Sequence, residues 1–291
     1  MILDQELLSA DDVLLEPKLG LLVSRGEAEI HSFIYSAPMD TVTGYDLAEA
    51  MLKVNEIPVI CREIEDEEYV RSIIAFHSTP AFFAVGATRN ELQRFISRME
   101  QALHDLTDDV KINVAIDIAH GDSVVAYEAI AFLREQPFIG DIMSGSICTG
   151  AAALRCIAAG CTHLRIGVGP GSVCTTRMMT GVGVPQLSAV YNIHKTLLQC
   201  NKRSFAILIA DGGIRYPGDA VKYLAAGADA IMMGSVFSKA KESLGWDRRW
   251  PIVRMEEVIS FPRPDPVPVL VKSYRGHASA DFQKDHRGRA N

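Results

Sequence analysis

The stretch THLRIGVGPGSVCTTRMMTGVGVPQLSAV, residues 162–190, decides the fold class of this chain. It opens with a short apolar run, HLRIG at 163–167, and continues through a glycine-rich loop at 167–186. It then enters a segment of helical periodicity at 186–198. A short apolar run followed by a helical segment is typical of a strand–helix unit in a parallel sheet.

The same unit recurs along the chain. Eight apolar runs predict strands: FIYSA at 33–37, IPVIC at 57–61, AFFAV at 81–85, INVAID at 112–117, IGDIM at 139–143, HLRIG at 163–167, FAILIA at 205–210 and AIMMG at 230–234. Helical patterns lie between them, at 46–54, 67–77, 90–106, 123–135, 150–160, 186–198 and 218–227. Eight strands alternating with helical segments favour a barrel, because an open doubly wound sheet usually has fewer strands. We expect an α/β fold, a (β/α)8 TIM barrel in a single domain over 1–291, with 236–291 as a C-terminal arm or partial flap and a tail.

Composition narrows the class of protein. The 291 residues are 48% hydrophobic and 22% charged, which is enough to bury a full core. With 29 Lys and Arg against 36 Asp and Glu, the net charge is −7. We expect no general nucleic-acid binding, since that affinity comes mainly from neutralising phosphates. The N-terminus, MILDQELLSADDVLLEP, lacks the pattern of a signal peptide, so we expect a cytoplasmic protein that binds no membrane.

The glycine-rich loop contains the best nucleophile candidate. Catalytic residues of barrels lie on loops after the carboxyl ends of strands, and Cys174 lies in the middle of such a loop. A reactive thiolate needs partial exposure and nearby donors. A merely flexible surface loop would not require Ser172, Cys174, Thr175 and Thr176 in one stretch. We expect the other five cysteines to be packing residues in strands or helices, because they show no CxxC pairing. They are Cys61, Cys148, Cys156, Cys161 and Cys200.

Other strand ends carry polar or glycine-rich segments. ADGGIRYPGD at 210–219 and MMGS at 232–235 follow the seventh and eighth runs, where barrels often bind phosphate through backbone N–H groups. Asp211 could accept hydrogen bonds from a ribose diol, or it could cap a turn. DIAHGDS at 117–123 follows the fourth run, so Asp117 and His120 could touch a cofactor, although His120 could equally be structural.

Together these segments resemble the IMP dehydrogenase and GMP reductase family. The resemblance lies in GPGSVCTTR at 169–177, DGG at 211–213, GS at 234–235 and SAPMDTVT at 36–43, and it extends from 10–20 to 274–279. It implies a barrel that binds a purine nucleoside 5′-monophosphate and a nicotinamide cofactor, NAD or NADP, at its C-terminal face. It also implies a homotetramer.

The resemblance also implies roles for individual residues. Cys174 would attack C2 of the purine to form a covalent thioimidate, and Thr176 would assist proton transfer. The implied phosphate contacts are Ser172, Gly213, Gly234, Ser235 and Tyr274. Asp211 would anchor the ribose and Met39 would face the base. The implied nicotinamide contacts are Asp117, Ala119 and Gly121. A potassium ion would bind the backbone carbonyls of Gly169, Gly171 and Cys174.

The family contains two reactions. In one, IMP gives up hydride to NAD and water releases XMP; in the other, GMP loses ammonia and accepts hydride from NADPH to give IMP. Thr180, the PQLSAV run at 185–190 and the absence of the regulatory insertion common in dehydrogenases favour GMP reductase. The DTVT, ADGGIR and YRG runs favour IMP dehydrogenase. We expect the reductase and keep the dehydrogenase as the alternative.

The chain also departs from the family pattern. Members continue past the YRG region into a flap with an Arg-Tyr pair in dehydrogenases or a Glu in reductases, and neither is found before Asn291. Cys61, Ser146 and His277 stand where the family usually has His, Asn and Met. A second hypothesis is therefore a nucleotide-binding barrel without turnover. A third is a barrel of another class, although no strand end offers the lysine of an aldolase and a flavin enzyme has no need of the cysteine.

Overall fold

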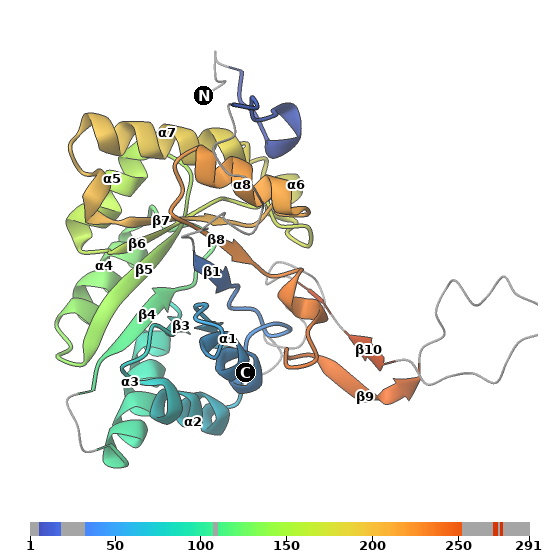
Figure 1. Ribbon diagram of the computed structural model, residues 1–291. Helices are drawn as coiled ribbons and strands as arrows, with labels where there is room; N and C mark the ends of the chain where they lie inside the picture. Colours follow the sequence, from blue (N-terminus) through green and yellow to red (C-terminus); the bar gives the residue numbers. More distant parts are fainter. Residues whose placement is uncertain (1–5, 19–32, 107–109, 252–269, 273, 276–291) are drawn as a thin grey trace, which may run out of the picture.

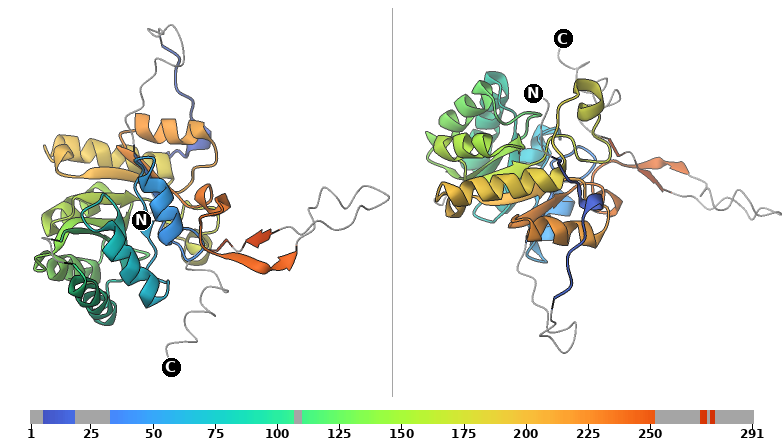
Figure 2. Two further views of the ribbon diagram at one scale, coloured as in Figure 1. Left: turned by 60° about the horizontal axis from the view of Figure 1, so that its bottom comes forward. Right: turned by 90° about the horizontal axis from the view of Figure 1, so that it is seen from above.

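The computed structural model describes residues 6–18, 33–106, 110–251, 270–272 and 274–275. Eight parallel strands form one sheet in the order β1-β8-β7-β6-β5-β4-β3-β2. The helices pack around the outside of this sheet, as the views in Figures 1 and 2 show. Every predicted apolar run overlaps one of the strands, so the expected (β/α)8 TIM barrel is confirmed.

The elements have the following bounds. The strands of the barrel are β1 (Phe33–Ser36), β2 (Val59–Ile60), β3 (Phe82–Val85), β4 (Ile112–Ile116), β5 (Ile139–Ile147), β6 (His163–Ile166), β7 (Ile207–Asp211) and β8 (Ala230–Met233). The helices are α1 (Tyr45–Leu52), α2 (Asp66–Phe76), α3 (Arg89–His104), α4 (Val124–Arg134), α5 (Gly150–Ala159), α6 (Thr176–Thr180), α7 (Gln186–Gln199) and α8 (Pro217–Ala225). Short 3₁₀ helices are η1 (Ala10–Asp12), η3 (Arg203–Phe205) and η4 (Phe237–Lys239). A separate antiparallel pair is formed by β9 (Trp246–Pro251) and β10 (Leu270–Lys272).

The ring of strands closes between β1 and the residue that precedes Pro58. β1 pairs with β8 over its whole length, from Phe33 opposite Ala230 to Ser36 opposite Met233. On its other side, the Ser36 amide donates to the Ile57 carbonyl at 3.2 Å and the Ile57 amide donates to the Ile34 carbonyl at 3.1 Å. This isolated parallel bridge joins the first strand to the second.

Two hydrophobic cores result from the alternation of side chains along the strands. On β3, Phe82 and Ala84 point into the barrel, whereas Phe83 and Val85 pack against the helices. The inner core also includes residues from most other strands, namely Tyr35, Ala37, Ile57, Val59, Ala115, Met143, Ile209, Ala230 and Met232. Its amino-terminal half is filled by rings: the His163 ring centroid lies 4.9 Å from that of Phe82 and 6.3 Å from that of Tyr35. The barrel is therefore packed at the amino ends of its strands.

The structure differs from the sequence expectations in three places. The expected irregular loop at 167–186 contains a helix, α6. β5 continues to Ile147, because Ile147 pairs with β6 although polar Ser144 and Ser146 precede it. β2 covers only Val59–Ile60, since the preceding Pro58 has no N–H to continue a ladder.

The described part of the expected C-terminal arm includes η4, the β9–β10 ribbon, which extends from the barrel in Figure 1, and residues 274–275. Residues 252–269, 273 and 276–291, among them His277, lie outside the described residues. In the part of the chain that the structure describes, no helix has both the length and the apolar character that a membrane span requires.

Candidate active site

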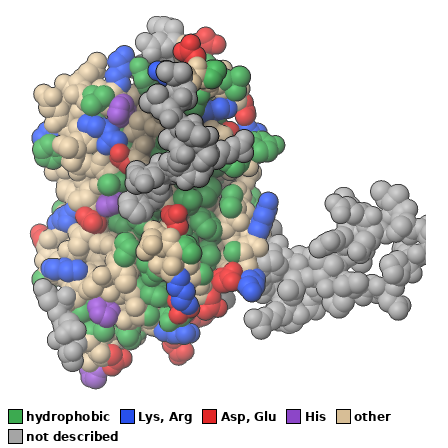
Figure 3. Space-filling model, in the orientation of Figure 1, with side chains coloured by type: hydrophobic (Ala, Val, Ile, Leu, Met, Phe, Trp, Pro, Cys, Tyr) green, Lys and Arg blue, Asp and Glu red, His purple; other side chains and the backbone are tan. Residues whose placement is uncertain are grey.

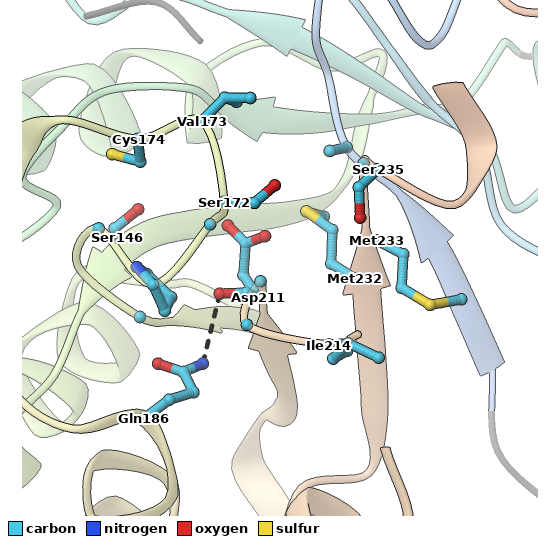
Figure 4. Close-up of a pocket in the computed structure, with 18 of the residues that line it drawn as sticks. Ser146, Ser172, Val173, Cys174, Gln186, Asp211, Ile214, Met232, Met233 and Ser235 are labelled. Atoms are coloured by element: carbon cyan, nitrogen blue, oxygen red, sulfur yellow. Dashed lines mark hydrogen bonds between the residues drawn. The ribbon is translucent and has the colours of Figure 1, made fainter. Parts of the chain in front are cut away.

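A cavity of about 930 Å³ opens at the carboxyl ends of the strands. Its walls come mainly from the segments after β1, β4, β6, β7 and β8 and from η1, with Arg62 after β2, Ser146 on β5 and Tyr274. Figure 4 shows Cys174 and Ser146 on one side of it, and Met232, Met233 and Ser235 on the other. The structure brings nearly all of the predicted site residues to this cavity: Met39, Asp117, Ala119, Gly169, Gly171, Ser172, Cys174, Thr176, Asp211, Gly213, Gly234, Ser235 and Tyr274.

Gly121 is the predicted site residue outside the lining. Its amide donates to the Ser146 carbonyl at 3.0 Å. A Cβ at this position would lie 2.7 Å from the backbone of Gly145, so the absence of a side chain lets the loop after β4 pack on β5. Gly121 thus lies behind the wall that Ser146 forms. His120, the uncertain candidate on the same loop, is exposed and does not line the cavity.

The half-buried Cys174 is held beside a hydroxyl. Its amide donates to the Gly171 carbonyl at 3.1 Å, and its thiol donates to Thr176 Oγ1 at 3.3 Å. Thr176 is the first residue of α6, so this short helix fixes the hydroxyl relative to the sulfur. Arg177, on the next position, donates to the carbonyls of Val168 and Val184 at 2.8 and 2.6 Å. Arg177 thereby joins the two ends of the loop.

The remaining cysteines have different surroundings. Burial raises the pKa of the Cys61 thiol well above its ordinary value, and burial also raises the pKa of Cys148. Cys156 and Cys161 are buried in the outer core. These positions agree with packing, but only Cys156 lies within a helix or strand, and Cys200 is exposed at the end of α7. The expectation that all five are packing residues in regular elements is therefore wrong.

Three hydroxyl groups converge at one end of the cavity. Tyr274 forms hydrogen bonds with the hydroxyls of Ser172 and Ser235; burial raises the pKa of Tyr274, and these two bonds act against that rise. A Cβ on Gly234 would lie 2.9 Å from Met39 Sδ and 3.1 Å from the Tyr274 oxygen, so glycine leaves room for this convergence. An ion pair of Arg275 with Asp40, at 2.7 Å, lies next to Tyr274 in the chain.

The floor of the cavity contains a buried arginine that the sequence reasoning missed. Arg165 on β6 is 7% exposed and forms ion pairs with Asp117 and Asp211, each at 2.9 Å. Burial by itself would lower the pKa of Arg165, but the charges of Asp211 and Asp117 raise it above its ordinary value. A signal was present in the sequence, since a charged residue in the middle of an apolar strand is rarely buried without partners.

A second missed residue ties two strand ends together. Gln186, at the start of α7, is 3% exposed. Its amide nitrogen donates to the Ile166 carbonyl at 2.6 Å and to the Asp211 carbonyl at 3.3 Å, the contact drawn in Figure 4. A Cβ on Gly167 would lie 2.7 Å from Gln186 Oε1, so the first glycine of the loop leaves space for this side chain. No pattern around PQLSAV distinguished Gln186 from an ordinary helix start.

The predicted potassium site consists of backbone oxygens. Within the described ranges, no group of three or more His, Cys, Asp or Glu side chains could hold a metal ion. The glycine-rich loop at 167–186, here called the Cys174 loop, carries the three predicted carbonyls; Gly169 has a left-handed conformation at φ +68°, and the Gly171 carbonyl accepts from the Cys174 amide. Among the described residues, no backbone amide donates to the carbonyl of Gly169 or Cys174. Free carbonyl oxygens of this kind fit a cation that prefers neutral oxygen ligands.

The surface shows no concentration of one charge on the face drawn in Figure 3. Lys and Arg side chains are interspersed there with Asp and Glu, and hydrophobic side chains lie along its middle. At the cavity, Arg215 also pairs with Asp11 of η1. Ser172, Ser235 and Tyr274 also line the cavity and provide hydroxyl donors.

Comparisons with known proteins point to one family. Residues 9–249 match the family model described as "IMP dehydrogenase / GMP reductase domain". The chain is 36% identical over 211 residues to the inosine-5′-monophosphate dehydrogenase of Chlorobaculum parvum, covering 68% of this chain and 41% of that protein. It is 45% identical over 130 residues to that of Borreliella burgdorferi, covering 45% and 31%.

The matched region contains the whole barrel. The Thermoplasma acidophilum inosine-5′-monophosphate dehydrogenase is 45% identical over 132 residues, covering 45% of this chain and 26% of that protein. The chain thus spans less than half the length of these curated relatives. Since the family model covers β1 to β8 and the Cys174 loop, this chain belongs to the IMP dehydrogenase / GMP reductase family.

Proposed function

We propose that this barrel oxidises IMP at C2 with NAD, through a covalent intermediate on Cys174. The observation that carries the proposal is the contact of the Cys174 thiol with Thr176 at the wall of a cavity that also holds a cluster of hydroxyls and Asp211. The relatives named above are inosine-5′-monophosphate dehydrogenases. They support the dehydrogenase, the alternative of the sequence analysis, whereas nothing in these comparisons supports the expected GMP reductase.

In this proposal the nucleotide binds along the line from Tyr274 to Cys174. Ser172, Ser235 and Tyr274, with the backbone of Gly213 and Gly234, hold the 5′-phosphate through neutral donors. Arg165 occupies Asp211 Oδ2, which leaves Oδ1 to accept hydrogen bonds from the ribose diol. Met39, beside Gly234, then faces the base.

The chemistry follows from the position of the sulfur. Cys174 Sγ bonds to C2 of IMP as the C2–N3 double bond opens, and the thiol proton passes to the ring nitrogen by way of the Thr176 hydroxyl, which lies 3.3 Å from the sulfur. C2 becomes tetrahedral and gives up hydride, leaving a thioimidate on Cys174. Water then attacks C2 and releases XMP, which restores the thiol and yields one proton overall. When bound beside Asp117 and Ala119, NAD supplies the hydride acceptor.

Potassium enters the proposal as an ordering ligand of the Cys174 loop. The carbonyls of Gly169, Gly171 and Cys174 would hold it, and the loop would keep the sulfur in place. The homotetramer and the cytoplasmic location stay predictions, to be checked by mass measurement in solution and by fractionation.

The decisive experiment is mass spectrometry of the intact protein combined with absorbance of the nicotinamide band. We expect IMP with NAD to give NADH and an IMP-derived adduct on wild type and on Cys200→Ala, the exposed-cysteine control, but not on Cys174→Ala. If the protein turns over GMP with NADPH but not IMP with NAD, the proposed dehydrogenase activity is wrong and the reductase activity takes its place. Nucleotide binding without any absorbance change, with all pairings of IMP or GMP with NAD or NADP in either redox state, would leave the barrel as a binding protein and refute the proposal.

A further inference from the structure

One side chain connects the two carboxylates that the proposed function assigns to different ligands. Arg165 Nε and Nη2 donate to Asp211 Oδ2 at 3.2 and 2.9 Å, while Nη1 donates to Asp117 Oδ1 at 2.9 Å. Asp211 ends β7 on the nucleotide side, and Asp117 follows β4 on the cofactor side. The guanidinium therefore spans the floor between the two halves of the cavity.

The surroundings of Arg165 leave little freedom for this bridge. A Cβ on Gly145 of β5 would lie 2.5 Å from the Cβ and the carbonyl of Arg165, so the neighbouring strand lies directly against it. A buried guanidinium that lost one of its carboxylates would be left with an uncompensated charge, which is strongly unfavourable. Arg165 is thus expected to keep both partners at once.

Asp117 is held from its other side as well. Arg62, which also lines the cavity, places Nε 3.9 Å from Asp117 Oδ2 and pairs with Glu63 at 3.0 Å and with Glu91. Charges therefore alternate across the floor from Glu91 through Arg62, Asp117 and Arg165 to Asp211. The guanidinium is planar and its donors have fixed directions, so the two carboxylates of Arg165 share one rigid set of hydrogen-bond donors.

We propose that Arg165 is a positioning residue that couples the two ligands, so that a nucleotide bound at Asp211 increases the affinity for the nicotinamide cofactor at Asp117. A ribose diol on Asp211 fixes that carboxylate and, through the rigid guanidinium, the orientation of Asp117. The cofactor then binds to a group that is already ordered, which lowers the entropy cost of binding. This inference rests on the proposed function of the two carboxylates.

The test measures the coupling itself. In a Cys174→Ala background, which prevents turnover, titration calorimetry gives the affinity for NAD alone, for IMP alone, and for NAD with saturating IMP. The coupling factor is the ratio of the two NAD affinities. Arg165→Lys keeps the charge but cannot serve two carboxylates with a planar fork. We expect it to reduce the coupling factor by about 2- to 30-fold, with a smaller change in the affinity for IMP alone.

A matched control lies at the other end of the barrel. Arg203 pairs with Asp229 at 2.6 Å, and Arg203→Lys should leave the coupling factor unchanged. If Arg165→Lys does not fold, Asp117→Asn is used instead. A direct loss of NAD affinity in that variant affects the measurements with and without IMP equally, so it cancels in the coupling factor. An unchanged coupling factor in a folded variant that binds IMP would overturn the inference alone. Failure of the Cys174→Ala parent to bind IMP would overturn the proposed function, and the coupling with it.

Discussion

Two ionisable side chains on β6, His163 and Arg165, are two residues apart and face the same barrel interior, yet they have opposite characters. Burial lowers the pKa of His163, although Asp141 and Asp229 act against this effect, and its ring packs against Phe82. Arg165 is buried to a similar degree but keeps its charge. The ordinary pKa of a guanidinium lies far above that of an imidazole, and Arg165 also donates hydrogen bonds directly to two carboxylates, Asp117 and Asp211.

The comparison extends to the two ends of the barrel. At the amino ends of the strands, Tyr35, Phe82 and His163 fill the interior with rings. At the carboxyl ends, the same interior opens into a cavity lined by glycines, hydroxyls and paired charges. We infer that stability depends mainly on the first end and chemistry on the second. Changes at the two ends should therefore affect different measurements.

The largest expected effect lies at the carboxyl end. Cys174→Ala removes the nucleophile and should lower turnover of IMP by at least about 10³-fold. Its melting temperature should match that of wild type, since the half-buried sulfur contributes little packing. Steady-state absorbance and thermal denaturation measure the two quantities. Substantial residual turnover would show that the sulfur is not the nucleophile.

The matching change at the amino end is Phe82→Ala. Loss of this ring leaves a cavity in the inner core and should lower the free energy of unfolding by about 3–5 kcal/mol. Urea denaturation gives this value, and calorimetry at low temperature should still find IMP binding close to that of wild type. A selective loss of IMP binding with unchanged stability would contradict the assignment of roles to the two ends.

The phosphate end can be separated from the rest of the cavity with Ser235→Ala. Loss of one hydroxyl to a charged ligand should weaken IMP binding by about 10-fold. Binding of inosine, which lacks the phosphate, should not change. Ser204→Ala, at the amino end, is the control. An equal loss for IMP and inosine would place the phosphate elsewhere.

The smallest effect concerns the pH dependence of stability. The folded-state pKa of His163 lies below its unfolded value of 6.5, so the unfolded chain binds the additional proton between these two values. Stability should therefore fall as the pH decreases through this window, by at most about 1.4 kcal/mol per pH unit. Urea denaturation at about pH 7.5 and 5.5 should show a flatter dependence for His163→Gln. The control is His104→Gln, at an exposed histidine, which should show the same pH dependence of stability as wild type.

Sequence reasoning was most successful for the barrel strands, because buried parallel strands consist of continuous apolar runs that stand out between polar loops. It failed for α6, since five residues within a glycine-rich loop give too short a pattern. Arg165 was missed for another reason. Its apolar neighbours identified the strand, and the charged residue within that strand was not considered as a site residue. The choice between reductase and dehydrogenase rested on short runs around Thr180, and the relatives do not support it.

The meeting of candidate site residues at one cavity could be predicted where a residue lies at the end of a strand. Asp117, Cys174 and Asp211 illustrate this, because barrel topology brings such positions together without further information. Tyr274 is different, since no local pattern indicates that it would reach Ser172 from a segment about a hundred positions further along. Its place came from the resemblance. Gln186 contacts two carbonyls, and such contacts leave no trace in hydropathy.

We expect the bridge between β1 and Ile57 to open more readily than the pairing of β1 with β8, because the bridge is isolated whereas β8 pairs with β1 from Phe33 to Ser36. Breaking the two hydrogen bonds that the Ser36 and Ile57 amides donate would open the barrel between β1 and Ile57 without breaking the other strand pairs. β1 is followed directly by the turn that contains Met39 and Asp40. Opening at Ile57 would therefore also make Met39, which lines the cavity, more mobile. Among the amides of the barrel sheet, those of Ser36 and Ile57 should therefore exchange early, and their deuterium uptake should slow when a bound nucleotide contacts Met39 beside Gly234.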